Sequence, residues 1–132
     1  MDTQNIKQKK KDLSDQIIVI NGDVAKLPFV DDSFDVVCCS HALYELKNQV
    51  RTDALIEMKR VIKPVGLVLI MEHEVPRRSF IKILFYIRVL MGPKDSREFV
   101  KQGLSPFKKI FTHVTLSHTP SGKSKLIICR KA

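Results

Sequence analysis

Glycine and tryptophan are scarce in this chain. Among 132 residues there is no tryptophan, and no two of the five glycines form a G-x-G pair. Loops that wrap a nucleotide need closely spaced glycines, because the backbone must approach the ligand without a Cβ and adopt positive φ. The printed sequence therefore contains no glycine-rich nucleotide loop, and it also lacks a P-loop and a G-x-S-x-G nucleophile elbow.

Long apolar runs and paired cysteines are missing as well. No run approaches the roughly 18–20 apolar residues of a membrane span. The cysteines Cys38, Cys39 and Cys129 form no C-x-x-C pair. We expect reduced thiols, with Cys38 and Cys39 inside a buried strand, and a cytoplasmic location.

The formal net charge is +9, and its basic residues are dispersed over termini and loops, with groups at 7–11, 77–78, 108–109 and 123–131. Aromatic residues are not interleaved with them as they are in proteins that stack single-stranded bases, so nucleic acid is not an expected partner. A solvated basic surface is favoured over attraction to anionic lipid or to a phosphorylated substrate.

Composition divides the chain into two parts. Residues 1–16 are polar and basic, as in a frayed helix or a disordered segment. Residues 17–132 carry the apolar patterns of one α/β domain, and 44% hydrophobic residues over the whole chain is ordinary for a globular protein.

The first half of this domain predicts a βαβ unit. The β-branched run 17–20 and the run 34–39 are typical of strands buried on both faces of a parallel sheet. Apolar residues at three- and four-residue steps predict a helix over 50–62, with Arg51 on its polar face. A turn at 63–66 then leads into a strand over 67–71, parallel to the preceding one.

The second half predicts helices followed by a hairpin. The segment 77–91 is apolar with basic residues along one side. A helix packed on the sheet is favoured there, and a basic amphipathic helix on a membrane surface is the alternative. A short helix over 96–101 follows. Strands over 110–118 and 125–130 flank a Thr-Pro-Ser-Gly turn and predict an antiparallel hairpin.

Three segments carry a family resemblance. They are Gly-Asp-Val-Ala-Lys-Leu-Pro-Phe at 22–29, Asp-Ser-Phe-Asp-Val-Val at 32–37 and Arg-Val-Ile-Lys-Pro-Val-Gly at 60–66. In order and spacing they resemble class I S-adenosylmethionine-dependent methyltransferases of the small-molecule type 11 kind. The resemblance implies a truncated Rossmann-like sheet, mostly parallel with a C-terminal antiparallel hairpin, and S-adenosylmethionine as cofactor.

The resemblance also implies cofactor contacts after two of the strands. Asp23 and the backbone of Val24 match the positions that contact adenine, and Ser40 and His41 match those that face the methionine moiety. Open α/β sheets bind ligands at this edge. His41 is also the candidate general base. From the residues alone, a turn capped by Asp23 and a hydrogen-bonded histidine at a strand–helix junction remain alternatives.

Tyr44, Glu72 and His73 are the candidate substrate-facing residues, with a solvated loop as the alternative for Glu72 and His73. His41 and residues 72–74 make an imaginable His/Glu cluster. Because consecutive side chains diverge, we predict no metal site there.

The family's glycine loop has no counterpart in these residues, so we expect an incomplete cofactor site with an open strand edge. We expect a second copy or another polypeptide to complete the cofactor site. The expected acceptor is a small molecule, and the apolar segment 77–91 favours a lipophilic one. The alternatives are a non-catalytic methyltransferase-like scaffold and a non-functional product of a truncated reading frame.

Overall fold

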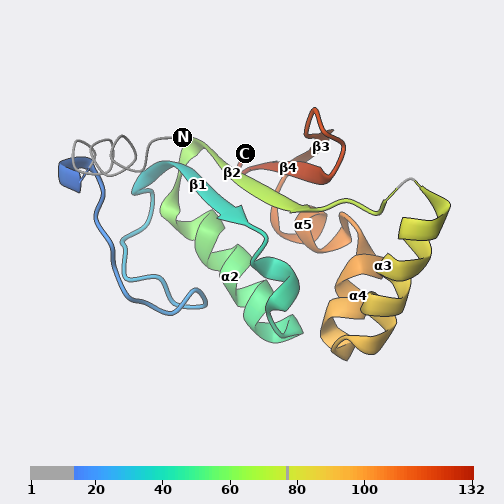
Figure 1. Cartoon of the computed structure of the whole chain (residues 1–132). Coiled ribbons are helices and arrows are strands. Elements are labelled where there is room, and N and C mark those ends of the chain that lie inside the picture. The colour runs from blue at the N-terminus through green and yellow to red at the C-terminus, as the bar shows by residue number, and fades with distance from the viewer. Residues whose placement is uncertain (1–13, 77) are drawn as a thin grey trace.

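The computed structural model describes residues 14–76 and 78–132 of the chain (Figure 1). Its centre is a four-stranded sheet in the order β1-β2-β4-β3. The strands are β1 (Phe34–Ser40), β2 (Ile62–His73), β3 (His113–His118) and β4 (Ser124–Arg130). β1 and β2 are parallel, whereas β2–β4 and β3–β4 are antiparallel. The α/β class and the C-terminal hairpin are confirmed.

Within the described residues, six helical segments accompany the sheet. They are the 3-10 turns η1 (Ser14–Gln16) and η2 (Leu43–Glu45) and the α-helices α2 (Asn48–Val61), α3 (Ser79–Met91), α4 (Lys94–Gln102) and α5 (Ser105–Ile110). Helices α2 and α5 lie under one face of the sheet, and α3 and α4 extend beyond the ends of β1 and β2 (Figure 1). Residues 1–13 of the predicted basic segment lie outside the described part, and the boundary at residue 17 stays a prediction.

One face of the sheet packs on the helices. β2 alternates buried and less buried residues, as a strand with one covered face does. Its Val68 and Ile70 belong with Ile127 of β4, Leu55 of α2 and Phe107 of α5 to one apolar cluster, and all five side chains are fully buried. Burying a side chain of this size contributes about 1.5–3 kcal/mol, so this cluster is the main source of cohesion.

The strand predicted over 17–20 is wrong. Its four side chains are 52–91% exposed, and no strand of the described part pairs with this segment. Without a neighbouring strand, extended backbone satisfies its polar groups with water, and apolar content alone does not make it a strand. The parallel part of the sheet is therefore the single β1–β2 pair.

Burial of the second predicted strand is also only partial. β1 is an edge strand, and its Val36 is 47% exposed and its Cys38 is exposed. Cys39 points to the covered side, where burial raises the pKa of its thiol. The expectation that both thiols lie inside a buried strand is correct only for Cys39.

The segment after β2 is helical, as predicted, but it does not pack on the sheet. α3 has its main contacts with α4, and Val89 is its one buried residue. Residue 77, the first residue of the predicted helix, lies outside the described part of the chain. Helix α5 was not predicted: the strand expected from residue 110 begins at His113 instead, because α5 continues to Ile110.

The turn predicted at 63–66 is absent, because β2 begins at Ile62 and runs through it with an irregular register opposite β1. Gly66 lies against β1 at this irregularity. A Cβ built on Gly66 would lie 2.7 Å from the backbone oxygen of Asp35. Glycine is therefore needed for close approach of the two backbones.

We predict that Gly66→Ala lowers the free energy of unfolding by about 2 kcal/mol, because the methyl group forces β1 and β2 apart. Urea denaturation measures the change. Gly92→Ala is the matched control, since a Cβ there would meet no atom closer than 3.4 Å. Equal effects of the two substitutions would contradict the close-approach argument.

Candidate functional site

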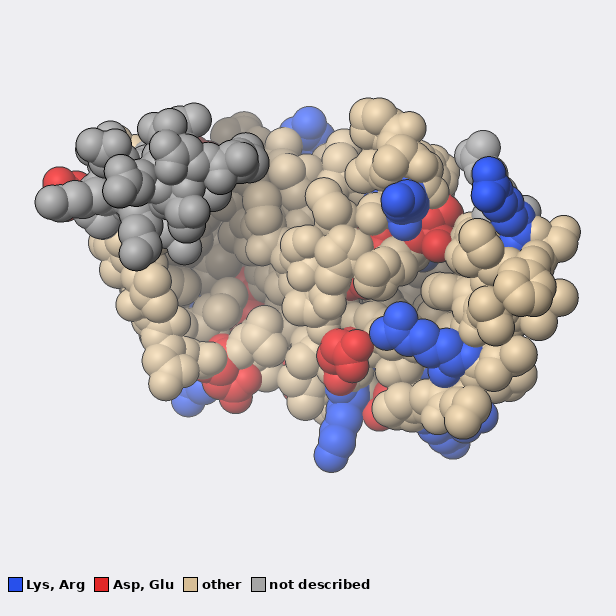
Figure 2. Space-filling view, in the orientation of Figure 1, with Lys and Arg blue, Asp and Glu red and all other residues tan. Residues whose placement is uncertain are grey.

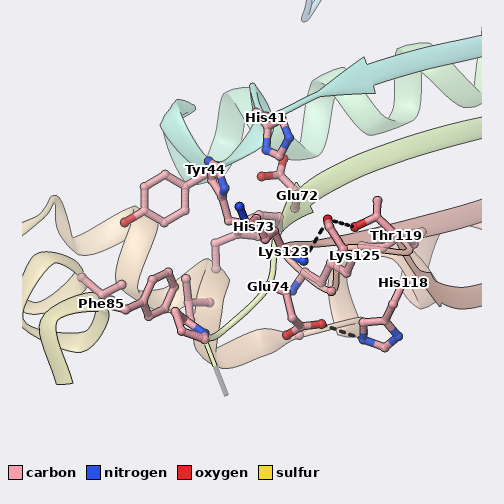
Figure 3. Close-up of a pocket in the computed structure, with 18 of the residues that line it drawn as sticks. His41, Tyr44, Glu72, His73, Glu74, Phe85, His118, Thr119, Lys123 and Lys125 are labelled. Carbon is pink, nitrogen blue, oxygen red and sulfur yellow. Dashed lines mark hydrogen bonds and ion pairs between the residues drawn. The ribbon is translucent and has the colours of Figure 1, made fainter. Parts of the chain in front are cut away.

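A cavity of about 720 Å³ lies where β1 and β2 end, bounded by α3, α4 and the β3–β4 hairpin (Figure 3). Carboxyl ends of parallel strands are the usual place for ligands in open α/β sheets. His41 follows β1, and Glu72 and His73 close β2. The parallel pairing of these strands brings His41 and Glu72, 31 positions apart in sequence, to one wall.

Glu72 and His41 place unpaired polar atoms at this wall. Glu72 is 3% exposed, and its Oε1 and the Nδ1 of His41 are buried without a hydrogen-bond partner among the described residues. Figure 3 shows the Glu72 carboxylate beside the His41 ring. Buried polar atoms left unpaired cost about 1–3 kcal/mol each, so this pair is suited to a polar ligand.

The backbone fixes the direction of His41. Its N–H donates to the carbonyl of Met71 over 2.8 Å, and its φ is +53°. Left-handed backbone is uncommon outside glycine, and such positions cluster at functional sites. His41 thus turns out of the strand toward Glu72, held by a bond to β2.

Burial controls the protonation of the cluster. Desolvation raises the pKa of Glu72, with His41 and nearby backbone amides of Leu43 and Tyr44 acting in the opposite direction. Desolvation lowers the pKa of His73, and repulsion from His41, whose ring centroid lies 4.3 Å away, lowers it further. Burial thus favours the protonated carboxyl of Glu72 and the neutral imidazole of His73.

The remaining walls of the cavity differ in polarity. One side is apolar and is formed by Ile81, Phe85, Val89, Phe99, Phe107 and Ile127. The hairpin side carries Lys123 and Lys125, and there Nε2 of His118 lies 2.7 Å from Glu74. These walls suit an apolar molecule with polar substituents at the Glu72 end.

Arg51 positions the loop that carries Tyr44 into the cavity. Its guanidinium, 2% exposed, donates to the carbonyls of Leu43 (2.8 Å) and Leu46 (2.6 Å) and lies 4.0 Å over the ring of Phe99. Ser96 of α4 donates to the carbonyl of Tyr44 over 2.9 Å. The buried charge of Arg51 on α2 thereby joins this helix to the loop after β1 and to α4.

Comparison with known proteins identifies the family. A family described as "Methyltransferase domain" matches residues 1–70 of the 132. The ubiquinone/menaquinone biosynthesis C-methyltransferase UbiE of Paracoccus denitrificans is 30% identical over 114 residues, covering 78% of this chain and 44% of that protein. This chain belongs to the S-adenosylmethionine-dependent methyltransferases.

A second relative agrees with this assignment. A demethylmenaquinone methyltransferase of Staphylococcus epidermidis is 36% identical over 97 residues, or 72% of this methyltransferase chain and 39% of the relative. The chain thus spans about two fifths of the length of these curated relatives.

Solved structures share the fold. The PH0226 protein of Pyrococcus horikoshii matches with a TM-score of 0.64 and 17% identity, over 97% of this methyltransferase chain and 68% of that one. A methyltransferase of Methanosarcina mazei gives 0.61 and 18% identity, over 83% and 65%. At this identity the likeness shows the fold, here a Rossmann-like methyltransferase fold.

The structure brings only some of the predicted site residues of this methyltransferase together. His41, Tyr44, Glu72 and His73 line the cavity. Their roles stay predictions. The histidine–glutamate cluster, for which we predicted no metal, consists of His41 and residues 72–74. Among the described residues, no group of three or more His, Cys, Asp and Glu side chains could hold a metal ion.

Asp23, Val24 and Ser40 do not line the cavity. One carboxylate oxygen of Asp23 accepts a hydrogen bond from the N–H of Ala25 over 2.9 Å and so stabilises a turn. Val24 packs against the core, and Ser40 pairs with Met71 at the end of β1. The adenine role of Asp23 and Val24 stays a prediction.

Sequence reasoning missed the far walls of the site and misplaced Arg51. Phe85, Phe99 and Lys123 face the cavity from elements whose positions depend on tertiary packing. Arg51 was predicted on the solvated face of its helix but is buried. Its spacing of three and four residues from Asn48 and Leu55 on α2 is the signal that could have placed it on the inner face.

We predict that Arg51→Met lowers the free energy of unfolding by about 3 kcal/mol, since it leaves the buried carbonyls of Leu43 and Leu46 without donors. Urea denaturation measures the change. Arg130→Met, at an exposed arginine, is the control and should change stability by less than about 0.5 kcal/mol. A small effect at Arg51 would contradict its organising role.

A pH dependence follows from Glu72. Its raised pKa means that the folded chain binds more protons than the unfolded chain above the ordinary value of 4.5. Stability contributed by this group therefore falls as the pH rises through the raised pKa. We predict that Glu72→Gln, which mimics the protonated acid, becomes more stable than the wild type with increasing pH. Thermal unfolding between pH 4 and 8 measures the difference, and a pH-independent difference would contradict the burial argument.

Proposed function

We propose that this chain supplies the acceptor side of an S-adenosylmethionine-dependent methyltransferase acting on a lipophilic, quinone-like small molecule. The observation that carries the proposal is the cavity at the ends of β1 and β2, with its buried Glu72–His41 pair and its aromatic wall. The names of the relatives, which specify ubiquinone, menaquinone and demethylmenaquinone, favour the same class of acceptor.

The residues present fit part of the cofactor. Unpaired atoms of Glu72 and His41 suit a cationic, polar group at the sheet edge. The side chain of Ser40 and the backbone of His41 would face the methionine part, and Asp23 and Val24 would hold adenine. The given sequence contains no G-x-G turn for the ribose and carboxylate end, so the residues that would bind this end of the cofactor are not among those given.

Acceptor binding depends on the walls of the cavity. The aromatic side chains of Tyr44, Phe85 and Phe99 line it. Offset or edge contacts between aromatic rings contribute about 0.5–1.5 kcal/mol beyond their area. Glu72 and His73 would bind the oxygen substituents of the ring.

His41 is the proton acceptor in this proposal. When bound, S-adenosylmethionine supplies an electrophilic methyl group on a sulfonium sulfur. Nδ1 of His41 takes the proton that the acceptor loses on methylation, and the adjacent Glu72 carboxylate stabilises the resulting imidazolium. The left-handed backbone of His41 holds the ring in place for this role.

We predict that His41→Asn lowers kcat for methyl transfer to a short-chain demethylmenaquinol about 100-fold, because a positioned base contributes at least that much. Asparagine tolerates left-handed backbone and cannot accept the proton. Transfer of radiolabelled methyl groups measures kcat. His113→Asn, on the exposed histidine of β3, is the matched control and should leave kcat unchanged.

Binding separates this function from a non-catalytic scaffold. The chain has two tyrosines and no tryptophan, so a quinone bound in the cavity should quench the fluorescence of Tyr44, and Tyr44→Phe should remove that quenching. Calorimetry with S-adenosylhomocysteine measures the donor side separately. Absence of saturable quinone binding to the wild type would refute the acceptor site and favour the scaffold.

A further inference from the structure

Helix α3 carries an apolar stripe that the rest of the described chain leaves uncovered. The stripe consists of Phe80, Ile83, Leu84, Ile87, Leu90 and Met91, which are 46–84% exposed. These residues recur at steps of three and four, so they share one face of the helix. A contiguous apolar surface of this kind marks an interaction site.

The stripe is separate from the wall of the cavity. Ile81, Phe85 and Val89 line the cavity from another face of α3. Tyr44 lines that cavity and also a shallow groove that contains Leu84, Ile87 and Met91 of the stripe. The groove therefore adjoins the cavity at Tyr44, which lines both.

Positive charge borders the stripe. Arg88 follows Leu84 by one helical turn and so borders the stripe, whereas Lys82 lies beyond Tyr86. Arg78 and Lys94 lie just beyond the ends of the helix, all four cations are exposed, and Arg78 and Arg88 also line the cavity. No acidic residue occurs within Ser79–Met91. Figure 2 shows this end of the molecule as a tan surface with Lys and Arg side chains beside it. An apolar face with flanking cations is the pattern of helices that lie in the interface of an anionic bilayer.

We propose that α3 docks on an anionic lipid bilayer, with the apolar stripe inserted among the headgroups and Arg88, which borders it, against lipid phosphates. At 13 residues α3 is about 20 Å long, and within the described residues no helix is long and apolar enough to cross a membrane. The helix therefore lies on the surface.

The docking extends the proposed function and rests on it, because membrane contact would serve the uptake of a lipophilic acceptor. A lipophilic acceptor dissolved in the bilayer would leave it along the groove beside Leu84 and Ile87 and reach the cavity past Tyr44. A second copy of the chain is the less suitable occupant of the stripe, because each copy would bring the same cations to the contact and the chain carries a net charge of +9.

Flotation with vesicles tests the docking, using the full chain without methyl donor or quinone. Vesicles of phosphatidylcholine with phosphatidylglycerol should bind the wild type, and those of phosphatidylcholine alone should bind it about tenfold less. The double variant Ile83→Glu/Leu90→Glu should bind the anionic vesicles at least about tenfold less than the wild type. Ile56→Glu, at a 49% exposed isoleucine of α2, is the matched control and should bind like the wild type.

Three results would overturn the docking. They are no flotation of the wild type, equal losses for Ile56→Glu and the double variant, and a dimer on a sizing column that the double variant dissociates while vesicles remain unbound. The last result would assign the stripe to contact between copies. Quenching of Tyr44 by a water-soluble quinone does not involve vesicles, so failure of docking and failure of the acceptor site are distinguishable.

Discussion

The buried guanidinium of Arg51 is the interaction on which the architecture of the site depends. A charge taken out of water is stable only when its donors are satisfied, and Arg51 finds these partners in carbonyls of the loop after β1. Because the same group stacks on Phe99 of α4, the sheet edge, α2 and the helical end of the molecule are held in one arrangement. Tyr44 and the aromatic wall face each other across the cavity for this reason.

Helix α3 combines two surfaces with different tasks. Its inner face closes the cavity over the Glu72–His41 pair, and its outer face is apolar and uncovered. In an ordinary globular helix the outer face is polar. A helix that is apolar on both sides places the acceptor cavity one helix diameter, about 10 Å, from whatever the outer face contacts. The helix thus gives this methyltransferase fold an apolar cavity wall and an exposed apolar surface on one element.

Sequence patterns predicted the helices and strands that local spacing of apolar residues specifies. They failed where a strand depends on a neighbouring strand to pair with. Helix α2 and the β3–β4 hairpin follow from spacing and turn residues. The run 17–20 has ideal strand composition, but β pairing is a property of two segments, and the described part offers no partner. The site shows the same division: His41 and Glu72 were found because strand ends are readable, whereas Phe99 and Arg51 reached the site through packing between helices distant in sequence.

The left-handed conformation of His41 restricts which residues this position can hold. With φ at +53°, β-branched side chains are strained there, and glycine, asparagine, aspartate and histidine are the residue types that adopt such backbone most readily. Random mutagenesis at this codon should therefore yield a small set of folded products whatever chemistry is selected. We expect descendants of this domain, whatever their function, to keep glycine or a residue of these types at this position, because the backbone geometry requires it.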